Sequence, residues 1–353
     1  MPSTMNWRHG LHQPGVLAAL GAALLFGGST PLAKWLLVSV NPWLLAGLLY
    51  LGSGVGLSLY RLVRHAPRGR LEAGEWPWLA GAILAGGVVA PVLLMFGLTG
   101  MPATGASLLL NAEGVFTSLL AWFVFRENVD RRIALGMAAI VAGALVLSWP
   151  QEARLGRVWP ALAVLGACLA WGIDNNLTRK VALADATWIA AIKGVAAGSA
   201  NLALALWLGA TWPPLPNLTA ALLIGALAYG LSLALFVVGL RHLGTARTGA
   251  YFSVAPFFGA VLAILLGESV SQRLLIAGLL MALGIWLHLS EHHSHEHEHV
   301  ELEHEHEHGH DAHHQHAHNA PVLPTTKHRH RHCHDGLNHE HTHFPDAHHR
   351  HNH

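Results

Sequence analysis

The sequence predicts an all-α integral membrane protein with ten transmembrane helices in two inverted five-helix repeats, followed by a disordered His-rich tail. Composition is the first observation behind this fold class: 52% of the 353 residues are hydrophobic and only 12% are charged, which excludes an ordinary soluble domain. The second is a succession of apolar runs before residue 291, each about 18 to 24 residues long, the length that a helix needs to cross a ~30 Å hydrocarbon core. The third is a similarity between the two halves of this region.

Ten spans are predicted, and the short connectors between them leave no room for a soluble domain. They lie at residues 15–37, 42–60, 77–99, 103–125, 132–149, 159–179, 187–209, 218–240, 246–267 and 272–289. The first run is too long for a signal peptide, so it is predicted to be an uncleaved span. The predicted organisation is an N-terminal segment (1–14), a first repeat (15–149), a connector (150–158), a second repeat (159–290) and the tail (291–353).

Lysine and arginine gather in alternate connectors, which sets the expected orientation, because positively charged loops stay in the cytoplasm. With the N-terminus inside, the cytoplasmic side holds Arg8, Arg61, Arg64, Arg68, Arg70, Arg126, Arg131, Arg132, Arg179, Lys180, Arg241 and Arg247. The opposite side receives only Arg154, Arg157 and Arg273. We therefore expect a multi-pass protein of a bacterial-type inner membrane with both termini in the cytoplasm.

The two halves of the apolar region repeat one another. The stretch "LGAALLFGGSTPLAK" aligns with "LGACLAWGIDNNLTR" and pairs Gly27 with Gly172, while "VFTSLLAWFVFRENVDRR" aligns with "PFFGAVLAILLGESVSQR" and pairs Glu127 with Glu268. The two offsets are nearly equal. Because five spans is an odd number, the second copy must cross the membrane in the opposite sense to the first, which gives an inverted-topology repeat.

These stretches, together with "GLRHLGTARTGAYFSVAPFFGAVLAILLGES", resemble the drug/metabolite transporter superfamily, and in particular proteins with two EamA-type domains. The resemblance covers residues 15–290. It implies a secondary carrier with a central substrate cavity between the halves, and many relatives of this kind export amino acids, nucleotides or other small metabolites. The first repeat departs from the family pattern, because the usual proline is kept only in the second repeat, as Pro256.

Glu113 stands about halfway along the fourth predicted span, in "LLLNAEGVFTSLL". A carboxylate there costs at least ~2.5 kcal/mol unless it faces a wet cavity or a partner, so it should face inward. It either lines the substrate route, binding a cationic group or a coupling proton, or is a structural carboxylate tied to a neighbouring helix. Asn111 lies close by, and Gly114 could open the helix at this point.

Polar residues also interrupt the sixth and seventh spans. Asp174 and Asn175 follow Trp171 in "WGIDNN", where consecutive polar groups cannot all face lipid. Asp174 either faces a cavity or pairs with a basic residue near the membrane surface, while Lys193 is either its counter-charge or reaches to the headgroups. The candidate substrate cavity comprises Glu113, Asn111, Gly114, Trp171, Asp174, Asn175, Lys193 and Pro256.

The tail concentrates metal ligands, since 24 of the 29 histidines lie from His292 onward, many alternating with glutamate. Imidazole and carboxylate bind zinc, nickel, cobalt and copper, and the dense spacing allows many equivalent ligand sets. The tail is therefore predicted to bind several ions without local selectivity. The first ligands along it are His292, His293, His295, His297, His299, His304, His306, His308, His310, His313, His314, His316 and His318.

The leading hypothesis is a secondary transporter that exports a small organic metabolite or drug-like solute by alternating access and requires no cofactor. One alternative is a nickel, cobalt or zinc exporter that uses the tail as a collector. Another is a membrane-tethered metal buffer or sensor without transport. The sequence holds no catalytic triad, phosphate loop or nucleic-acid-binding patch, so neither an enzyme nor a nucleic-acid partner is expected.

Overall fold

The computed structural model describes residues 14–67, 69–125, 131–148, 158–181, 184–243, 248, 251–289, 294–298, 302–308, 328–334 and 338–342. The chain divides into two compact units, Met1–Glu291 and His292–His353. In its described residues, the first unit is entirely helical apart from turns and connectors, and the strands belong to the second.

Helices occupy each of the ten predicted spans. The first repeat contains α2 (Pro14–Leu36), α3 (Pro42–Val63), α4 (Trp76–Ala82), the π-helical segment η1 (Ile83–Val89), α5 (Ala90–Gly100), α6 (Ala103–Leu109), α7 (Ala112–Phe125) and α8 (Arg131–Ser148). The second contains α9 (Trp159–Thr178), α10 (Ala186–Trp207), α11 (Leu215–Gly225), the π-helical segment η4 (Ala226–Leu231), α12 (Ser232–Leu243), α14 (Ala255–Leu265) and α15 (Gln272–Leu289). The all-α membrane fold is thus confirmed.

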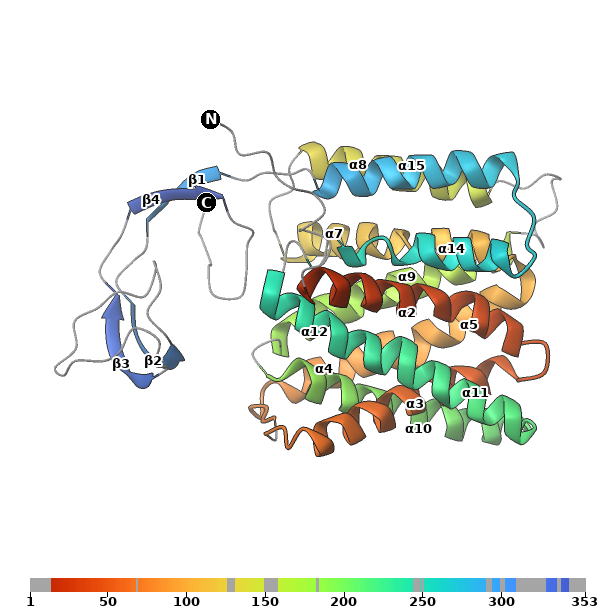
Figure 1. Ribbon diagram of the computed structural model, residues 1–353, viewed down its shortest axis with the longest axis horizontal. Coiled ribbons are helices and arrows are strands. Elements are labelled where there is room, and N and C mark those ends of the chain that lie inside the picture. Colours follow the sequence, from red (N-terminus) through yellow and green to blue (C-terminus); the bar gives the residue numbers. More distant parts are fainter. Residues whose placement is uncertain are drawn as a thin grey trace. The chain divides into compact units, whose positions relative to one another are not determined.

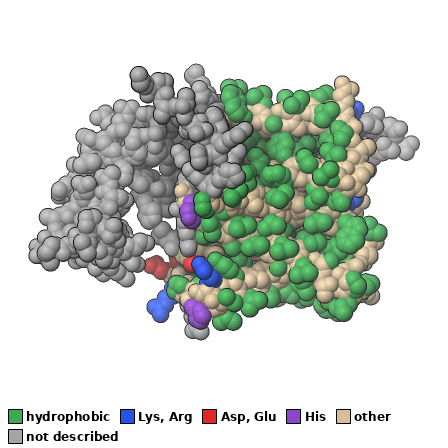
Figure 2. Space-filling model, in the orientation of Figure 1, with side chains coloured by type: hydrophobic (Ala, Val, Ile, Leu, Met, Phe, Trp, Pro, Cys, Tyr) green, Lys and Arg blue, Asp and Glu red, His purple; other side chains and the backbone are tan. Residues whose placement is uncertain are grey.

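Length and composition alone qualify six helices of the described chain as membrane spans: Pro14–Leu36, Pro42–Val63, Trp76–Gly100, Ala103–Val124, Ala186–Trp207 and Leu215–Gly239. Shorter apolar helices lie at Ala134–Ser148, Ala255–Leu265 and Gln272–Leu287. Hydrophobic side chains cover the face of this unit seen in Figure 2, and the coloured charged side chains lie at its two ends. This distribution suits a surface that meets lipid.

The helices of the two repeats exchange partners rather than forming separate bundles (Figure 1). The second helix of each repeat pairs with the other, as α3 with α10, and so do the last helices, α8 with α15. The first helix of each repeat packs against the third and fourth spans of the other: α2 against α12 and α14, and α9 against α5 and α7. The inverted repeat predicted from the sequence is therefore a single interlocked body.

Repeat-related glycines sit at equivalent helix crossings. A Cβ added to Gly27 of α2 would lie 2.0 Å from the carbonyl oxygen of Ala255 in α14, and one added to Gly172 of α9 would lie 3.1 Å from Phe116 Cβ in α7. Only glycine allows the backbones to approach so closely at the first crossing. The alignment of Gly27 with Gly172 thus marks the same contact in both halves.

The fourth span is broken one turn before the position that the sequence suggested. Gly114 lies inside α7, and the break falls at Leu110 and Asn111 instead. The Asn111 side chain donates to the Leu108 carbonyl at 2.9 Å. Such local side-chain bonds compete with the helical ladder, so the amide rather than the glycine is associated with the break.

A carboxylate from the second repeat caps the first turn of α6, the helix that opens this span. Glu268, in the connector after α14, accepts the backbone N–H groups of Ala103 and Thr104 at 2.7 and 2.8 Å. These N–H groups have no intrahelical partner at the start of α6, so the carboxylate satisfies them. Glu127, its counterpart in the alignment, lies outside the described residues.

The described segments of the tail form short strands. Strand β1 (Ser294–Glu298) pairs antiparallel with β4 (Asn338–Thr342), and β2 (Leu302–His308) pairs antiparallel with β3 (His328–His334). The physical reason lies in the alternation of residue types, which has the two-residue period of a strand. The register sets Glu305 opposite Arg331 and Glu307 opposite Arg329.

Candidate functional site

A cavity of about 330 Å³ lies among α3, α9, α10, η4 and α12. Its polar lining comes from Tyr50, Ser53, Asp174, Thr178, Lys193 and Tyr229. Ala184, in the connector before α10, and Ala186, the first residue of α10, also line it. The cavity therefore extends from the interior of the bundle to the end at which α9 stops and α10 begins.

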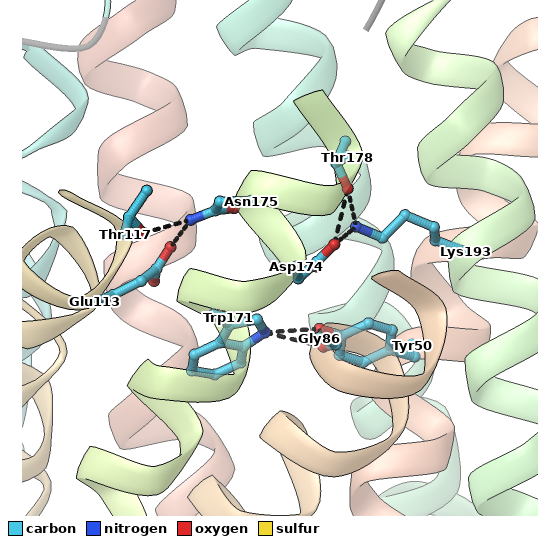
Figure 3. A network of polar contacts seen from close by, with 9 residues as sticks. All are labelled: Tyr50, Gly86, Glu113, Thr117, Trp171, Asp174, Asn175, Thr178 and Lys193. Atoms are coloured by element: carbon cyan, nitrogen blue, oxygen red, sulfur yellow. Dashed lines mark hydrogen bonds and ion pairs between the residues drawn. The ribbon is translucent and has the colours of Figure 1, made fainter. Parts of the chain in front are cut away.

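Asp174 and Lys193 form an ion pair on the cavity wall (Figure 3). Their side chains are only 9% and 16% exposed. Thr178, one turn after Asp174 on α9, donates to the aspartate at 2.8 Å, and the Lys193 ammonium donates to the Thr178 hydroxyl at 3.1 Å. Two charges removed from water are costly unless they are paired and hydrogen-bonded, and this triad meets both conditions.

Gly86 makes the space that Asp174 occupies. A Cβ on Gly86 would lie 1.9 Å from Asp174 Oδ2, so any side chain there would collide with the carboxylate. Gly86 belongs to η1, in which Ala90 N–H bonds to the Ala85 carbonyl with π-helical spacing. The next donor in that pattern would be Pro91, which has no N–H, and this leaves the Gly86 carbonyl without a backbone partner at that spacing.

Two aromatic side chains supply the missing donors. Tyr50 O–H and Trp171 Nε1–H both donate to the Gly86 carbonyl, at 2.7 and 2.9 Å (Figure 3). Trp171 Nε1 also lies 3.2 Å from the Tyr50 oxygen. The Gly86 carbonyl, which the π-helical segment leaves free, thus bonds α3 and α9 to η1 immediately beside the ion pair.

Aromatic rings from α3 and η4 form another part of the cavity wall. The Tyr50 and Tyr229 ring centroids are 5.7 Å apart, and Phe26 stands edge-on to Tyr229 at 5.6 Å. Neither tyrosine was a candidate from the sequence. Their signal was available, because both lie in the middle of spans rather than at the membrane surface, where tyrosine anchors helices.

Glu113 and Asn175 meet on a different face of α9. Asn175 Nδ2 donates to Glu113 Oε1 at 2.9 Å and to Thr117 Oγ1 at 3.2 Å, both partners lying on α7. In Figure 3, Asn175 points from α9 to α7, and Asp174 points away from it to Lys193 on α10. Adjacent residues of one helix therefore serve two separate polar clusters.

The other predicted site residues do not join either cluster. Asn111 is buried, and besides its bond to the Leu108 carbonyl its amide lies 3.8 Å from the Met281 sulfur of α15. Gly114 is exposed, with nothing within 4 Å of where a Cβ would stand, and Pro256 stands in the first turn of α14. Of the eight positions, Asp174, Lys193 and Trp171 come together at or beside the cavity.

An ionic cluster stands at the cavity mouth. Arg61, near the end of α3, donates to Asp185, to Thr187 and to the Pro67 carbonyl. Asp185 caps the N-terminus of α10 by accepting the Trp188 N–H at 2.8 Å. Burial acts to raise the pKa of Asp185, but the bonds from Thr187 and Trp188 and the charge of Arg61 outweigh it, so the pKa lies below its ordinary value.

The candidate metal ligands of the tail fall in two groups. His295, His297, His304, His306 and His308 belong to strands β1 and β2. The remaining eight lie outside the described residues: His292, His293, His299, His310, His313, His314, His316 and His318. Within the described parts of the chain, no three His, Cys, Asp or Glu residues are placed to hold a metal ion.

Two interlocked inverted repeats around a polar, charged cavity define a membrane transporter. The chain belongs to the EamA-like transporter family, whose model matches residues 13–149 and 158–290. A solved structure titled "Crystal structure of protein" is 20% identical, with a TM-score of 0.59, and the match covers 77% of this chain and 95% of that one. At this identity the likeness concerns the fold alone.

Among relatives, an "Uncharacterized transporter" of Methanothermobacter thermautotrophicus is 29% identical over 77% of this chain and 85% of its own length. A "Probable amino-acid metabolite efflux pump" of Salmonella typhimurium is 37% identical over 23% of this chain and 28% of that protein. A "Probable 4-amino-4-deoxy-L-arabinose-phosphoundecaprenol flippase subunit" of Pseudomonas fluorescens is 39% identical over 22% of this chain and 66% of that protein. A transporter of small solutes agrees with these names.

Proposed function

We propose that this protein exports a small organic solute carrying both a positive and a negative group, by alternating access around the cavity. The observation that carries the proposal is the Asp174–Lys193 pair on the cavity wall. An entering ammonium group can replace Lys193 as the partner of Asp174, while an entering carboxylate can replace Asp174 as the partner of Lys193. Each buried charge then keeps an opposite charge beside it.

The size and lining of the cavity support the same class of cargo. Its volume of about 330 Å³ lies at the small end of the range for ligand sites, ~300–1,000 Å³. Tyr50 and Tyr229 contribute ring faces and hydroxyls to its wall, which suits a solute with an apolar body. The relative from Salmonella typhimurium, whose name specifies amino-acid metabolites, agrees with a zwitterionic cargo.

The orientation expected from Lys and Arg supports outward transport. Arg179 and Lys180 stand between α9 and α10, at the end of the bundle to which the cavity extends. If positively charged connectors are cytoplasmic, the cavity lies on the cytoplasmic side, and both termini lie there too. A solute would then enter from the cytoplasm and leave after the two interlocked halves have rocked.

Counterflow into liposomes containing the purified full-length protein tests the cargo. The panel would contain radiolabelled alanine, phenylalanine, succinate and putrescine, which separate zwitterions from anions and cations. We expect exchange of a zwitterion, reduced at least about tenfold by Lys193→Met and by Asp174→Asn, since a lost charged partner costs a site more than ~1.4 kcal/mol. Arg64→Met, which removes a positive charge from an exposed position, is the matched control and should retain exchange.

Exchange of succinate or putrescine but of neither amino acid would contradict the proposed cargo. Equal exchange by the wild type and both cavity variants would contradict the proposed site. Thr178→Val removes the hydroxyl but keeps both charges, so it should have a smaller effect than either charge-removing variant.

We further propose that the tail binds zinc, nickel, cobalt or copper in the cytoplasm, as its density of imidazole and carboxylate groups supports. Calorimetric titration of the full-length protein and of a variant ending at residue 290 tests this, with binding of several ions expected only for the full-length chain. Counterflow of the organic solute should be the same for both. Loss of cellular tolerance to nickel, cobalt or zinc on truncation would favour metal as cargo instead.

A further inference from the structure

Two carboxylates within the membrane spans, Asp174 on α9 and Glu113 on α7, have partners of different chemistry. Asp174 is bonded to the Thr178 hydroxyl and to an ammonium, which can only donate. Glu113 accepts a hydrogen bond from the amide of Asn175. Among the described residues, the Glu113 side chain has no other hydrogen-bond partner. Lys193, the cation nearest in the network of Figure 3, is already bonded to Asp174 and Thr178.

An amide partner suits both protonation states of a carboxyl group. Its Nδ2–H donates to a carboxylate, and after a flip of the amide its oxygen accepts the O–H of a carboxylic acid. Thr117, which accepts from the same Asn175 amide at 3.2 Å, carries a hydroxyl that can likewise donate or accept. The Glu113 cluster can therefore remain hydrogen-bonded when a proton arrives or leaves, whereas protonation of Asp174 would leave a buried ammonium without its counter-charge.

The Glu113 cluster is also open on one side. Glu113 is half-buried and Asn175 is exposed, while the neighbouring Gly114 has open space where its side chain would be. A carboxyl and an amide are poorly solvated by hydrocarbon, so a half-buried carboxyl beside an exposed amide within membrane spans requires a crevice that admits water. Water in such a crevice provides the route by which a proton reaches the carboxyl group.

We propose that Glu113 is a proton-binding site that takes up and releases one proton in each transport cycle, linked through α9 to the solute cavity. The proton passes from water to a carboxylate oxygen of Glu113 and later from that oxygen to water on the other side of the membrane, and no bond to the solute forms. Asn175 belongs to α9 and directly follows Asp174. A change in the hydrogen bond between Glu113 and Asn175 would therefore be transmitted through α9 to Asp174. The linkage to the solute rests on the proposed function, whereas proton binding by Glu113 does not.

The surroundings of Glu113 contain few competing titratable groups. α7 packs against α9 and α8. α9 contributes Asp174, held by Lys193, and the buried thiol of Cys168, and residues 134–148 of α8 contain no titratable side chain. Tyr50 lies beyond Trp171 and is bonded to the Gly86 carbonyl.

Infrared difference spectroscopy of the full-length protein in liposomes, recorded between two pH values, tests proton binding directly. We expect carbonyl-stretching bands of protonated carboxylic acids to appear on acidification and to shift in D2O, and the component that arises from Glu113 to be lost in Glu113→Gln. Glu268→Gln, which changes a carboxylate that caps α6, is the matched control and should retain this component. Bands that persist unchanged in Glu113→Gln would overturn the proposal.

Labelling of a cavity cysteine tests the linkage without knowledge of the solute. Ala190 lines the cavity, so Ala190→Cys in a chain with Cys168→Ala and Cys333→Ala can be labelled with a water-soluble maleimide at several pH values. The ratio of labelling rates with Glu113 and with Glu113→Gln cancels the ionisation of the thiol itself. We expect this ratio to change severalfold with pH; a constant ratio would refute linkage through α9. If both experiments give the expected results but no organic solute is exchanged, the proposed cargo fails and the proton site stands.

Discussion

Gly86 shows how a single residue shapes the site. Its missing side chain admits the Asp174 carboxylate, and its carbonyl, deprived of the Pro91 donor, accepts Tyr50 and Trp171. One position thus provides the space for one charged group and the acceptor for two ring donors. The ion pair is consequently sensitive to the backbone of η1 as well as to its own charges.

Gly86→Ala is expected to abolish solute exchange, because its Cβ would stand 1.9 Å from Asp174 Oδ2 and force the carboxylate from its place. Gly278→Ala in α15 is the control: its Cβ would meet Leu108 Cδ1 at 3.6 Å, an ordinary contact, and alanine is favoured over glycine in a helix by up to ~1 kcal/mol. Counterflow with matched amounts of folded protein measures both. Full activity in Gly86→Ala would show that Asp174 can move without consequence.

At the scale of elements, Arg61 and Asp185 join the end of α3 to the start of α10. Asp185→Ala removes both this bond and the N-cap, and should destabilise the protein by about 1 kcal/mol at neutral pH. The pKa of Asp185 is lowered in the folded state, so its contribution is present above its ordinary value of about 4 and is lost as the pH falls through the lowered value.

Thermal unfolding in detergent measures this dependence. The difference between the wild type and Asp185→Ala should be constant from pH 5 to pH 7 and shrink at more acidic pH, while Glu72→Ala, at an exposed position in the connector before α4, should change little at any pH. A difference that grows on acidification would contradict the role assigned to the carboxylate.

The sequence predicted elements well and partners poorly. Spans follow from the length of apolar runs, and Asp174 and Lys193 stand out because charges are costly in a membrane. Nothing in the spacing of Gly27 says that its neighbour is Ala255, since contacts between distant segments depend on the shape of both surfaces. Tyr50 and Tyr229 could have been marked as unusual by their mid-span positions, but their contact with each other could not be predicted for the same reason.

At the scale of the whole molecule, we expect the two ends of the chain to lie on one side of the membrane, because ten is an even number of spans. A Cys333-only chain and a chain in which Ser3→Cys is the sole cysteine should both be labelled by a membrane-impermeant maleimide in inverted vesicles and both be protected in intact spheroplasts. Opposite labelling of the two positions would require an odd number of crossings.

The exchange of partners between repeats also has a consequence for how the chain is made. Gly27 cannot meet its neighbours Ala255 and Gly259 until almost the entire helical unit has left the ribosome, which at ~5–20 residues per second is roughly ten to fifty seconds later. During that interval the early helices stand in the bilayer with an unfilled groove. In the nascent chain, lipid or an insertion factor should therefore cover the surface of α2 around Gly27 until α14 is synthesised and packs against it.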